Sequence, residues 1–260
     1  MIQLAVNLSM IFTEVPLIER FALAAEHGFS TVEIQFPYEL SIADIRQQLN
    51  QHQLKLCLMN VPAGDLMQGG NGIAGLPGAE AEFKQALDLA IEYAHALAVP
   101  RVNILAGRKP LDVERLSCIE TLVSNLKYAS TKLAEHQIQP VFEMINGTDM
   151  PHFLVQNIAQ AQEIIEAVQH PALKMQFDCY HMAMMQENVL DALQVNINQI
   201  GHIQFADCPG RNQPDTANIQ FQEIFDYLQK SPYSGYVAAE YKPSPNSSTS
   251  FAWKNKYFLN

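Results

Sequence analysis

Four oxygen-bearing side chains stand near the ends of four apolar runs in the second half of the sequence. Glu143 ends the run QPVFE, and Glu240 ends the run YVAAE near the C-terminus. Between them, Asp178 lies in LKMQFDCYH and Gln204 lies in GHIQFAD. A carboxylate inside an apolar strand costs free energy unless it is paired, hydrogen-bonded or bound to a metal. Three carboxylates and an amide at matching positions therefore predict one shared polar site.

These four side chains form an oxygen-only ligand set, which suits Mg²⁺ or Mn²⁺ better than Zn²⁺, because zinc prefers nitrogen or sulfur. Several neighbours are candidates for substrate binding. His181 follows Asp178 by three residues and could contact substrate or support a metal ligand; packing is the alternative. Arg211 follows the run that carries Gln204, and Lys242 follows Glu240 by two residues. Either cation could hold an anionic substrate; the alternative is that each is simply a solvated surface residue. Asn7, late in the first apolar run, is the remaining candidate.

The elements that must position these residues alternate between apolar β-forming runs and amphipathic helical runs. The predicted strands cover residues 3–9, 31–36, 54–60, 101–107, 139–143, 173–181, 201–207 and 236–242. The predicted helices cover residues 15–27, 41–51, 79–97, 112–136, 152–168, 186–198 and 219–229, with a last short helix around Trp253. Ser41 is the expected N-cap of the second helix, with Asp44 as its capping-box partner.

Strand–helix alternation implies parallel strands joined by right-handed crossovers. Eight such units in 260 residues match the size of a closed (β/α)₈ TIM barrel, in which catalytic groups come from the C-terminal strand ends. An open doubly wound sheet is the alternative fold. No glycine-rich phosphate turn follows the first strand, so we expect no nucleotide cofactor. We predict an α/β protein with a single barrel domain over residues 1–260 and a C-terminal helical extension from about residue 244.

A long loop at residues 61–78 joins the third predicted strand to the next helix. It contains six glycines, and its length suits a mobile cover over a site; a plain surface excursion is the alternative.

Composition narrows the class of protein. Hydrophobic residues make up 48% of the chain, enough for a sizeable core, and the formal net charge is −11. This acidic balance argues against a nucleic-acid surface, which needs a basic face. The four cysteines make no CxxC pair, which favours reduced thiols in a cytoplasmic protein. We find no signal peptide, and no run approaches the roughly 18 apolar residues of a membrane span.

The sequence resembles the hydroxypyruvate isomerase family, within the xylose-isomerase-like barrel superfamily. The resemblance covers nearly the whole chain and rests on NLSMIFTEVPLIERFALAAEHGF, VEIQFPYE, the loop from PAGD to GLPG, FEMIN, QFDCYHM, GHIQFAD and AAEYKP. The stretch SMIFTEVPLIERFA also resembles the related 2-oxo-tetronate isomerases. FEMIN and DCYHM are more similar to the hydroxypyruvate enzymes.

The resemblance implies that Glu143 and Glu240 are the acid/base pair. It also implies that Glu143, Asp178, Gln204 and Glu240 surround a divalent metal where one is bound. Related ketose epimerases usually have histidine at the position of Gln204. Because an amide is a weaker ligand, the metal could be weakly bound or dispensable. The implied substrate is a small anionic hydroxy-keto acid, and the implied reaction interconverts hydroxypyruvate and tartronate semialdehyde through an enediolate.

Three rival functions remain at this stage. The first is 2-oxo-tetronate isomerisation, which uses the same chemistry on a four-carbon acid. The second is a nucleic-acid-processing barrel of the endonuclease IV type, which would need a histidine-rich zinc cluster and a basic groove. The third is a non-catalytic binding protein for a sugar or acid. We expect no membrane partner and no nucleic-acid partner, and a homo-oligomer is left open.

Overall fold

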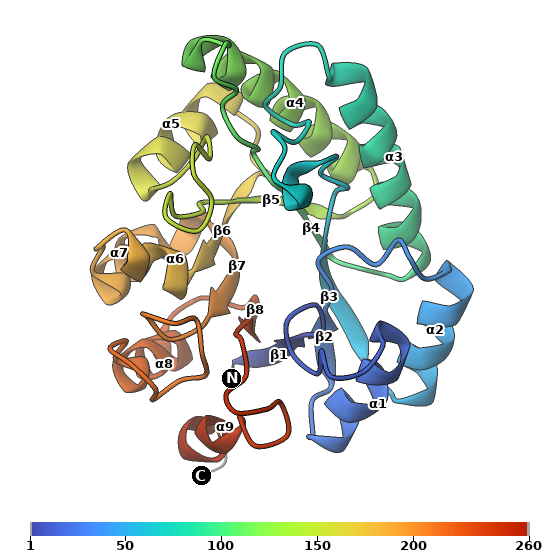
Figure 1. The fold of residues 1–260 in the computed structure, drawn as a ribbon, viewed down its shortest axis with the longest axis vertical. Helices are drawn as coiled ribbons and strands as arrows, with labels where there is room; N and C mark the ends of the chain where they lie inside the picture. Colours follow the sequence, from blue (N-terminus) through green and yellow to red (C-terminus); the bar gives the residue numbers. More distant parts are fainter. Residues whose placement is uncertain (1, 259–260) are drawn as a thin grey trace. The chain divides into compact units, whose positions relative to one another are not determined.

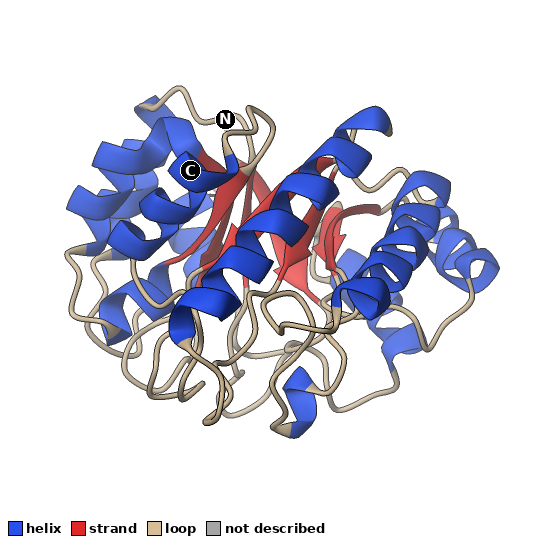
Figure 2. Ribbon diagram, turned by 90° about the horizontal axis from the view of Figure 1, so that it is seen from above, coloured by secondary structure: helices blue, strands red, loops and turns tan. Residues whose placement is uncertain are grey.

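The structure is a computed structural model that describes residues 2–258. Residue 1 and residues 259–260 of the predicted single domain lie outside the described part. Helices and strands alternate along the chain (Figure 1, Figure 2). Within residues 2–258, no helix combines the length and the apolar character needed to cross a bilayer.

Eight strands hydrogen-bond in sequence order into a closed barrel, which confirms the predicted (β/α)₈ fold class. The strands are β1 (Gln3–Asn7), β2 (Thr31–Glu33), β3 (Lys55–Asn60), β4 (Arg101–Ile104), β5 (Gln139–Glu143), β6 (Lys174–Asp178), β7 (Ile200–Phe205) and β8 (Tyr236–Ala239). The helices are α1 (Leu17–Glu26), α2 (Ile42–Gln51), α3 (Glu80–Ala96), α4 (Arg115–Glu135), α5 (Ile158–Val168), α6 (Cys179–Met184), α7 (Val189–Asn196), α8 (Phe221–Lys230) and α9 (Ala252–Phe258).

Several predicted strands extend too far, and the sixth shows why. β6 ends at Asp178, and the short helix α6 starts at Cys179, so the apolar run 173–181 continues past the strand and His181 lies beyond the strand end. The Asp178 Oδ1 atom accepts a hydrogen bond from the backbone N–H of Tyr180 at 2.9 Å. Asp178 thus caps the helix that follows its own strand, which is a common role of aspartate.

Helix boundaries follow their capping residues. The Ser41 Oγ atom accepts from the Asp44 N–H at 3.1 Å, which confirms Ser41 as the N-cap of α2. The predicted helix start at residue 152 was wrong, since α5 begins at Ile158. The Asn157 side chain caps α5 by accepting from the Gln160 N–H at 3.0 Å.

The chain divides into two compact units. The first comprises residues 1–57 and 177–260, and within it β1 pairs in parallel with both β2 and β8. Helix α8 buries one apolar stripe, formed by Phe221, Ile224, Phe225 and Leu228 at helical spacing. The Trp253 ring of α9 lies 5.2 Å from the Phe205 ring of β7, so the predicted C-terminal helix packs on this unit's core.

The second unit comprises residues 58–176. Its strands β4 and β5 pair in parallel, with Arg101 opposite Gln139 and Ile104 opposite Phe142. The long loop after β3 is tied down by Arg108, whose Nη1 donates to the carbonyls of Leu66 (3.2 Å) and Gly70 (2.8 Å). The role of this loop as a lid stays a prediction.

Candidate active site

In the first unit, buried polar side chains stand at the C-terminal ends of its strands. Asn7 ends β1 and pairs in register with Glu33, which ends β2. Gln204 is the penultimate residue of β7, and Glu240 directly follows β8. All four residues are at most 2% exposed. The parallel strand ends therefore gather a polar cluster inside an apolar core, as the sequence predicted for Gln204 and Glu240.

Two amides join the two carboxylates of this cluster. Asn7 Nδ2 donates to Glu33 Oε1 and to Glu240 Oε1, each at 2.8 Å. Gln204 Nε2 donates to the same two oxygens, at 2.7 Å and 3.0 Å. Gln35, half-buried after β2, adds a third amide donor to Glu240 Oε1 at 2.9 Å. These donors offset part of the cost of burying two carboxyl groups.

Arg211 brings positive charge to the acids. It lies in the loop after β7 with a left-handed backbone (φ 56°). Its Nη2 atom donates to Asp178 Oδ2 at 3.3 Å and to Glu240 Oε2. Its guanidinium carbon lies 5.1 Å from the centre of the Tyr180 ring. The cation expected near the substrate thus contacts two of the predicted site acids directly.

Burial perturbs the titration of Glu240 strongly. Burial raises the pKa of Glu240 to about 8, with Arg211 opposing the shift and the charges of Glu33 and Asp178 adding to it. At neutral pH this carboxyl is therefore largely protonated and can donate a proton. A carboxyl whose pKa lies near the working pH is suited to general acid–base catalysis.

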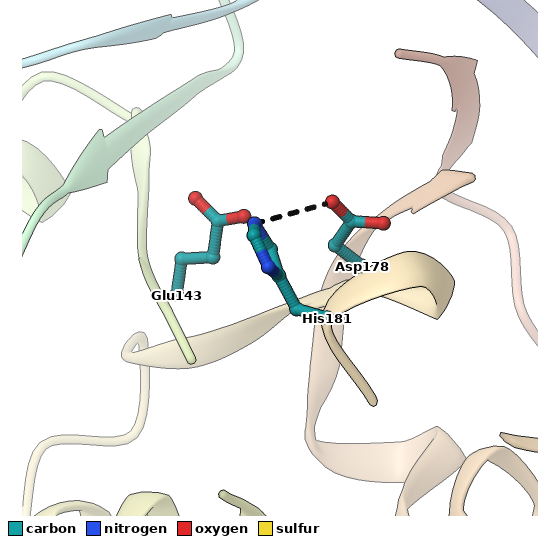
Figure 3. A group of neighbouring side chains, drawn as sticks. All are labelled: Glu143, Asp178 and His181. Carbon is teal, nitrogen blue, oxygen red and sulfur yellow. Dashed lines mark ion pairs between the residues drawn. The ribbon is translucent and has the colours of Figure 1, made fainter. Parts of the chain in front are cut away.

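Asp178 and His181 form a second pair at the end of β6 (Figure 3). The His181 Nε2 atom lies 3.6 Å from Asp178 Oδ2, and both side chains are buried. Burial lowers the pKa of His181 well below its usual value, and the charge of Arg211 lowers it further. The imidazole is therefore neutral at pH 7, which leaves it able to bind a metal or accept a hydrogen bond.

Glu143 belongs to the second unit and ends β5 with 5% exposure. Asn103 Nδ2 on β4 donates to Glu143 Oε2 at 3.4 Å and to Asn60 Oδ1 at 3.2 Å. In the β5–β6 register, Glu143 lies opposite Gln176, two residues before the strand-ending acid of β6. The sequence thus predicted correctly that Glu143 is a buried strand-end acid.

Within the first unit, Asp178 and His181 could each supply a ligand to a metal ion (Figure 3). Carboxylate oxygens with one imidazole nitrogen are a plausible donor set for Mn²⁺ and related divalent ions. The Arg211 guanidinium between two site acids shows that positive charge is stabilised there. His181 is not part of the predicted ligand set, which comprises Glu143, Asp178, Gln204 and Glu240.

The other sequence candidates fall in different places. Lys242 is exposed, and its backbone N–H donates to the Arg211 carbonyl at 2.6 Å.

Sequence reasoning missed Glu33 and His202. The signal for Glu33 was an acid within the β-forming run TVEIQF, and His202 lies two residues before Gln204, on the same strand face.

The cysteines do not offer a nucleophile at this site. Cys57, Cys118, Cys179 and Cys208 are all buried. Burial raises the pKa of the Cys179 thiol, and the charge of Asp178 raises it further. A thiol held in this protonated form is unreactive, so packing is the role of Cys179 that the structure supports.

Comparison with known proteins defines the class. The family model described as xylose isomerase-like TIM barrel matches residues 21–257. The chain belongs to this family. A solved structure from Escherichia coli, a 3-keto-D-glucoside 4-epimerase, shares the fold with a TM-score of 0.83 at 18% identity, covering 98% of this chain and 100% of that one.

Curated relatives narrow the class to isomerases. The chain is 37% identical to the hydroxypyruvate isomerase of Escherichia coli (strain K12), covering 99% of this chain and 100% of the relative. It is 36% identical to a 2-oxo-tetronate isomerase of Cupriavidus necator, covering 97% of each. A crystal structure from Brucella melitensis, titled AP endonuclease, family 2, matches at 35% identity with a TM-score of 0.95 over 99% of both chains. The chain is therefore an isomerase of this family, as the sequence predicted.

Proposed function

We propose that the protein interconverts hydroxypyruvate and tartronate semialdehyde. The observation that carries the proposal is Glu240, a buried strand-end carboxyl whose pKa is raised to about 8. The relatives named hydroxypyruvate isomerase support the choice of substrate. A small hydroxy-keto acid has acidic C–H bonds, which suit a base, a carbonyl, which suits an acid, and a carboxylate, which suits a cation.

The reaction moves one hydrogen between carbons and one between oxygens. The Glu143 carboxylate takes a proton from C3, and the electron pair forms the C2–C3 double bond of an enediolate. A proton passes from the C3 hydroxyl to the C2 oxygen, and the Glu240 carboxyl protonates C2. The C3 carbonyl forms as the double bond is lost. Exchange with water then returns each glutamate to its starting form.

Arg211 is the proposed partner of the substrate carboxylate. Its guanidinium already contacts carboxylate oxygens of Asp178 and Glu240, and a guanidinium binds carboxylates through charge-assisted, often bidentate hydrogen bonds. Burial of the surrounding acids strengthens this interaction, because water competes less for the donors.

A divalent metal is the proposed cofactor, Mg²⁺ or Mn²⁺. Glu143, Asp178 and either His181 or the predicted pair Gln204 and Glu240 would hold it. When bound, such an ion polarises the substrate carbonyl and stabilises enediolate charge. Because its pKa lies well below the usual value, His181 is neutral and can act as a ligand without first losing a proton.

A substrate panel tests the proposal. Purified protein is incubated with small 2-keto and 3-keto hydroxy acids, with added Mg²⁺ or Mn²⁺ or with EDTA, and products are followed by NMR. We expect hydroxypyruvate to be converted with the highest kcat/KM. Failure to convert any of these acids under every metal condition would refute the proposed function.

The second candidate is 2-oxo-tetronate isomerisation, which the near-equal identity to a named 2-oxo-tetronate isomerase favours. The same panel decides between the two, because the four-carbon acid differs by one carbinol. A kcat/KM for that acid far above the value for hydroxypyruvate would reverse our choice. Cleavage of abasic-site DNA, suggested by the name of the Brucella structure, is disfavoured by the net charge of −11.

Location is a further proposal. We infer a cytoplasmic enzyme, because its four cysteines lie far apart in the sequence and make no CxxC pair, which fits reduced thiols.

A further inference from the structure

Glu33 is a buried carboxylate at the end of β2 that the reaction scheme does not use. It is 0% exposed. Its Oε1 atom accepts from Asn7 Nδ2 at 2.8 Å and from Gln204 Nε2 at 2.7 Å. Its Oε2 atom lies 2.6 Å from His202 Nε2. Both carboxylate oxygens thus contact groups of the candidate active site or of the strand that carries it.

These contacts determine which way the Gln204 amide faces. An amide NH₂ group donates hydrogen bonds and accepts none, and the Oε1 atoms of Glu33 and Glu240 act here as acceptors, so it is the NH₂ end of Gln204 that lies between the two carboxyl groups. Gln204 Nε2 donates to Glu33 and to Glu240. The Gln204 carbonyl oxygen is consequently turned away from both acids. A change at Glu33 removes one of the two contacts that fix this orientation.

Asn7 shares these contacts but has an independent anchor. Its Oδ1 atom accepts from the backbone N–H groups of Ser9 at 2.8 Å and Met10 at 3.1 Å. The Asn7 amide therefore keeps its orientation without Glu33. The effect of changing Glu33 should fall mainly on Gln204.

His202 holds Glu33 from the far side. It is 0% exposed, and its Nδ1 atom has no hydrogen-bond partner within residues 2–258. The other ring nitrogen, Nε2, lies 2.6 Å from Glu33 Oε2, which is hydrogen-bonding distance. This contact restrains the Glu33 carboxyl group from the side of β7.

We propose that Glu33, held by His202, is a positioning residue that orients the Gln204 amide, so that its carbonyl oxygen faces the reacting substrate. The inference rests on the proposed isomerase function of the same site. Residues that orient a ligand or substrate contact are typically worth roughly 10–100-fold in activity or affinity.

The test is a double-mutant cycle on kcat. Glu33→Met removes the acceptor at constant side-chain length, and Glu33→Gln keeps one acceptor oxygen and provides a second variant if the first does not fold. Gln204→Met removes the amide. We expect Glu33→Met to lower kcat by roughly 10–100-fold, with KM changed much less, and Glu33→Gln to retain more activity.

In the Gln204→Met background, replacing Glu33 should cost little further activity, because residues that act through one another are non-additive. If the double variant instead loses kcat by the product of the two single-variant factors, the inference is overturned. Asn196→Leu is the matched control, since it removes a buried amide before the start of β7 that bonds Ala192 O. It should lower stability and leave kcat unchanged.

A second readout does not depend on activity. The side-chain NH₂ resonances of Gln204 are assigned by their loss in Gln204→Met. We expect them to be protected from solvent exchange in the wild type and to lose protection in the Glu33 variants. If the wild type converts no substrate, the proposed function fails, yet this NMR result still decides the orientation. Unchanged protection in both Glu33 variants would overturn it.

Discussion

Replacing Glu240 by glutamine should change how the stability of the protein depends on pH. Burial raises the pKa of this carboxyl from its usual 4.5 to about 8. Between these two values the folded protein keeps a proton that the unfolded chain releases. The unfolded state is therefore favoured as pH rises, and the stability present below pH 4.5 is progressively lost up to pH 8. Glutamine cannot ionise, so the variant should not lose stability through this group as the pH rises.

The size of the effect follows from the width of that interval. Each pH unit is worth about 1.4 kcal/mol, so the interval from 4.5 to about 8 corresponds to at most about 5 kcal/mol. Other titrating groups, including His181, are common to both proteins. Their contributions cancel in the difference between wild type and variant.

The assay is urea unfolding in EDTA at intervals from pH 5 to pH 9. We expect the free energy of unfolding of wild type to fall relative to Glu240→Gln by several kcal/mol across this range. Parallel curves for the two proteins would refute the account of a buried carboxyl that ionises only above neutrality.

Three further outcomes are expected. Arg211→Gln should raise KM by roughly tenfold or more, because a charge-assisted hydrogen bond is worth about 1.5–3 kcal/mol; an unchanged KM would exclude Arg211 from substrate binding. EDTA should lower turnover, and Mn²⁺ should restore it in wild type but less well in Asp178→Asn; full activity of the metal-free enzyme would remove the metal from the mechanism. Ser41→Ala should cost about 1 kcal/mol of unfolding free energy in urea, and no measurable loss would mean that the α2 cap is dispensable.

Local sequence patterns were sufficient to predict the barrel and its strand-end acids. Each acid interrupts an apolar run just before a turn, and eight strand–helix units fit a closed ring of parallel strands. Strand ends were predicted less well, because capping decides them. Asp178 ends β6 by capping α6, which apolar patterning alone does not reveal.

Contacts between distant residues could not be predicted. Glu33 and His202 are separated by 169 residues. Because β2 has only three residues, the sequence pattern did not mark Glu33 as an acid at a strand end. The position of Arg211 depends on its left-handed backbone and on a loop held by Asp207, which accepts from the N–H groups of Thr216 and Ala217. Such loop geometry depends on the folded structure and cannot be inferred from the spacing of residue types along the sequence.

The most direct test of the central claim is turnover of the preferred acid by Glu143→Gln and Glu240→Gln, with Glu135→Gln on the exposed surface of α4 as the control. General acid–base catalysis is worth roughly 10²–10⁴-fold, so each site variant should lose at least that order of kcat while circular dichroism shows an intact fold. The control should retain wild-type turnover. Wild-type turnover in either folded site variant would contradict the two-glutamate account.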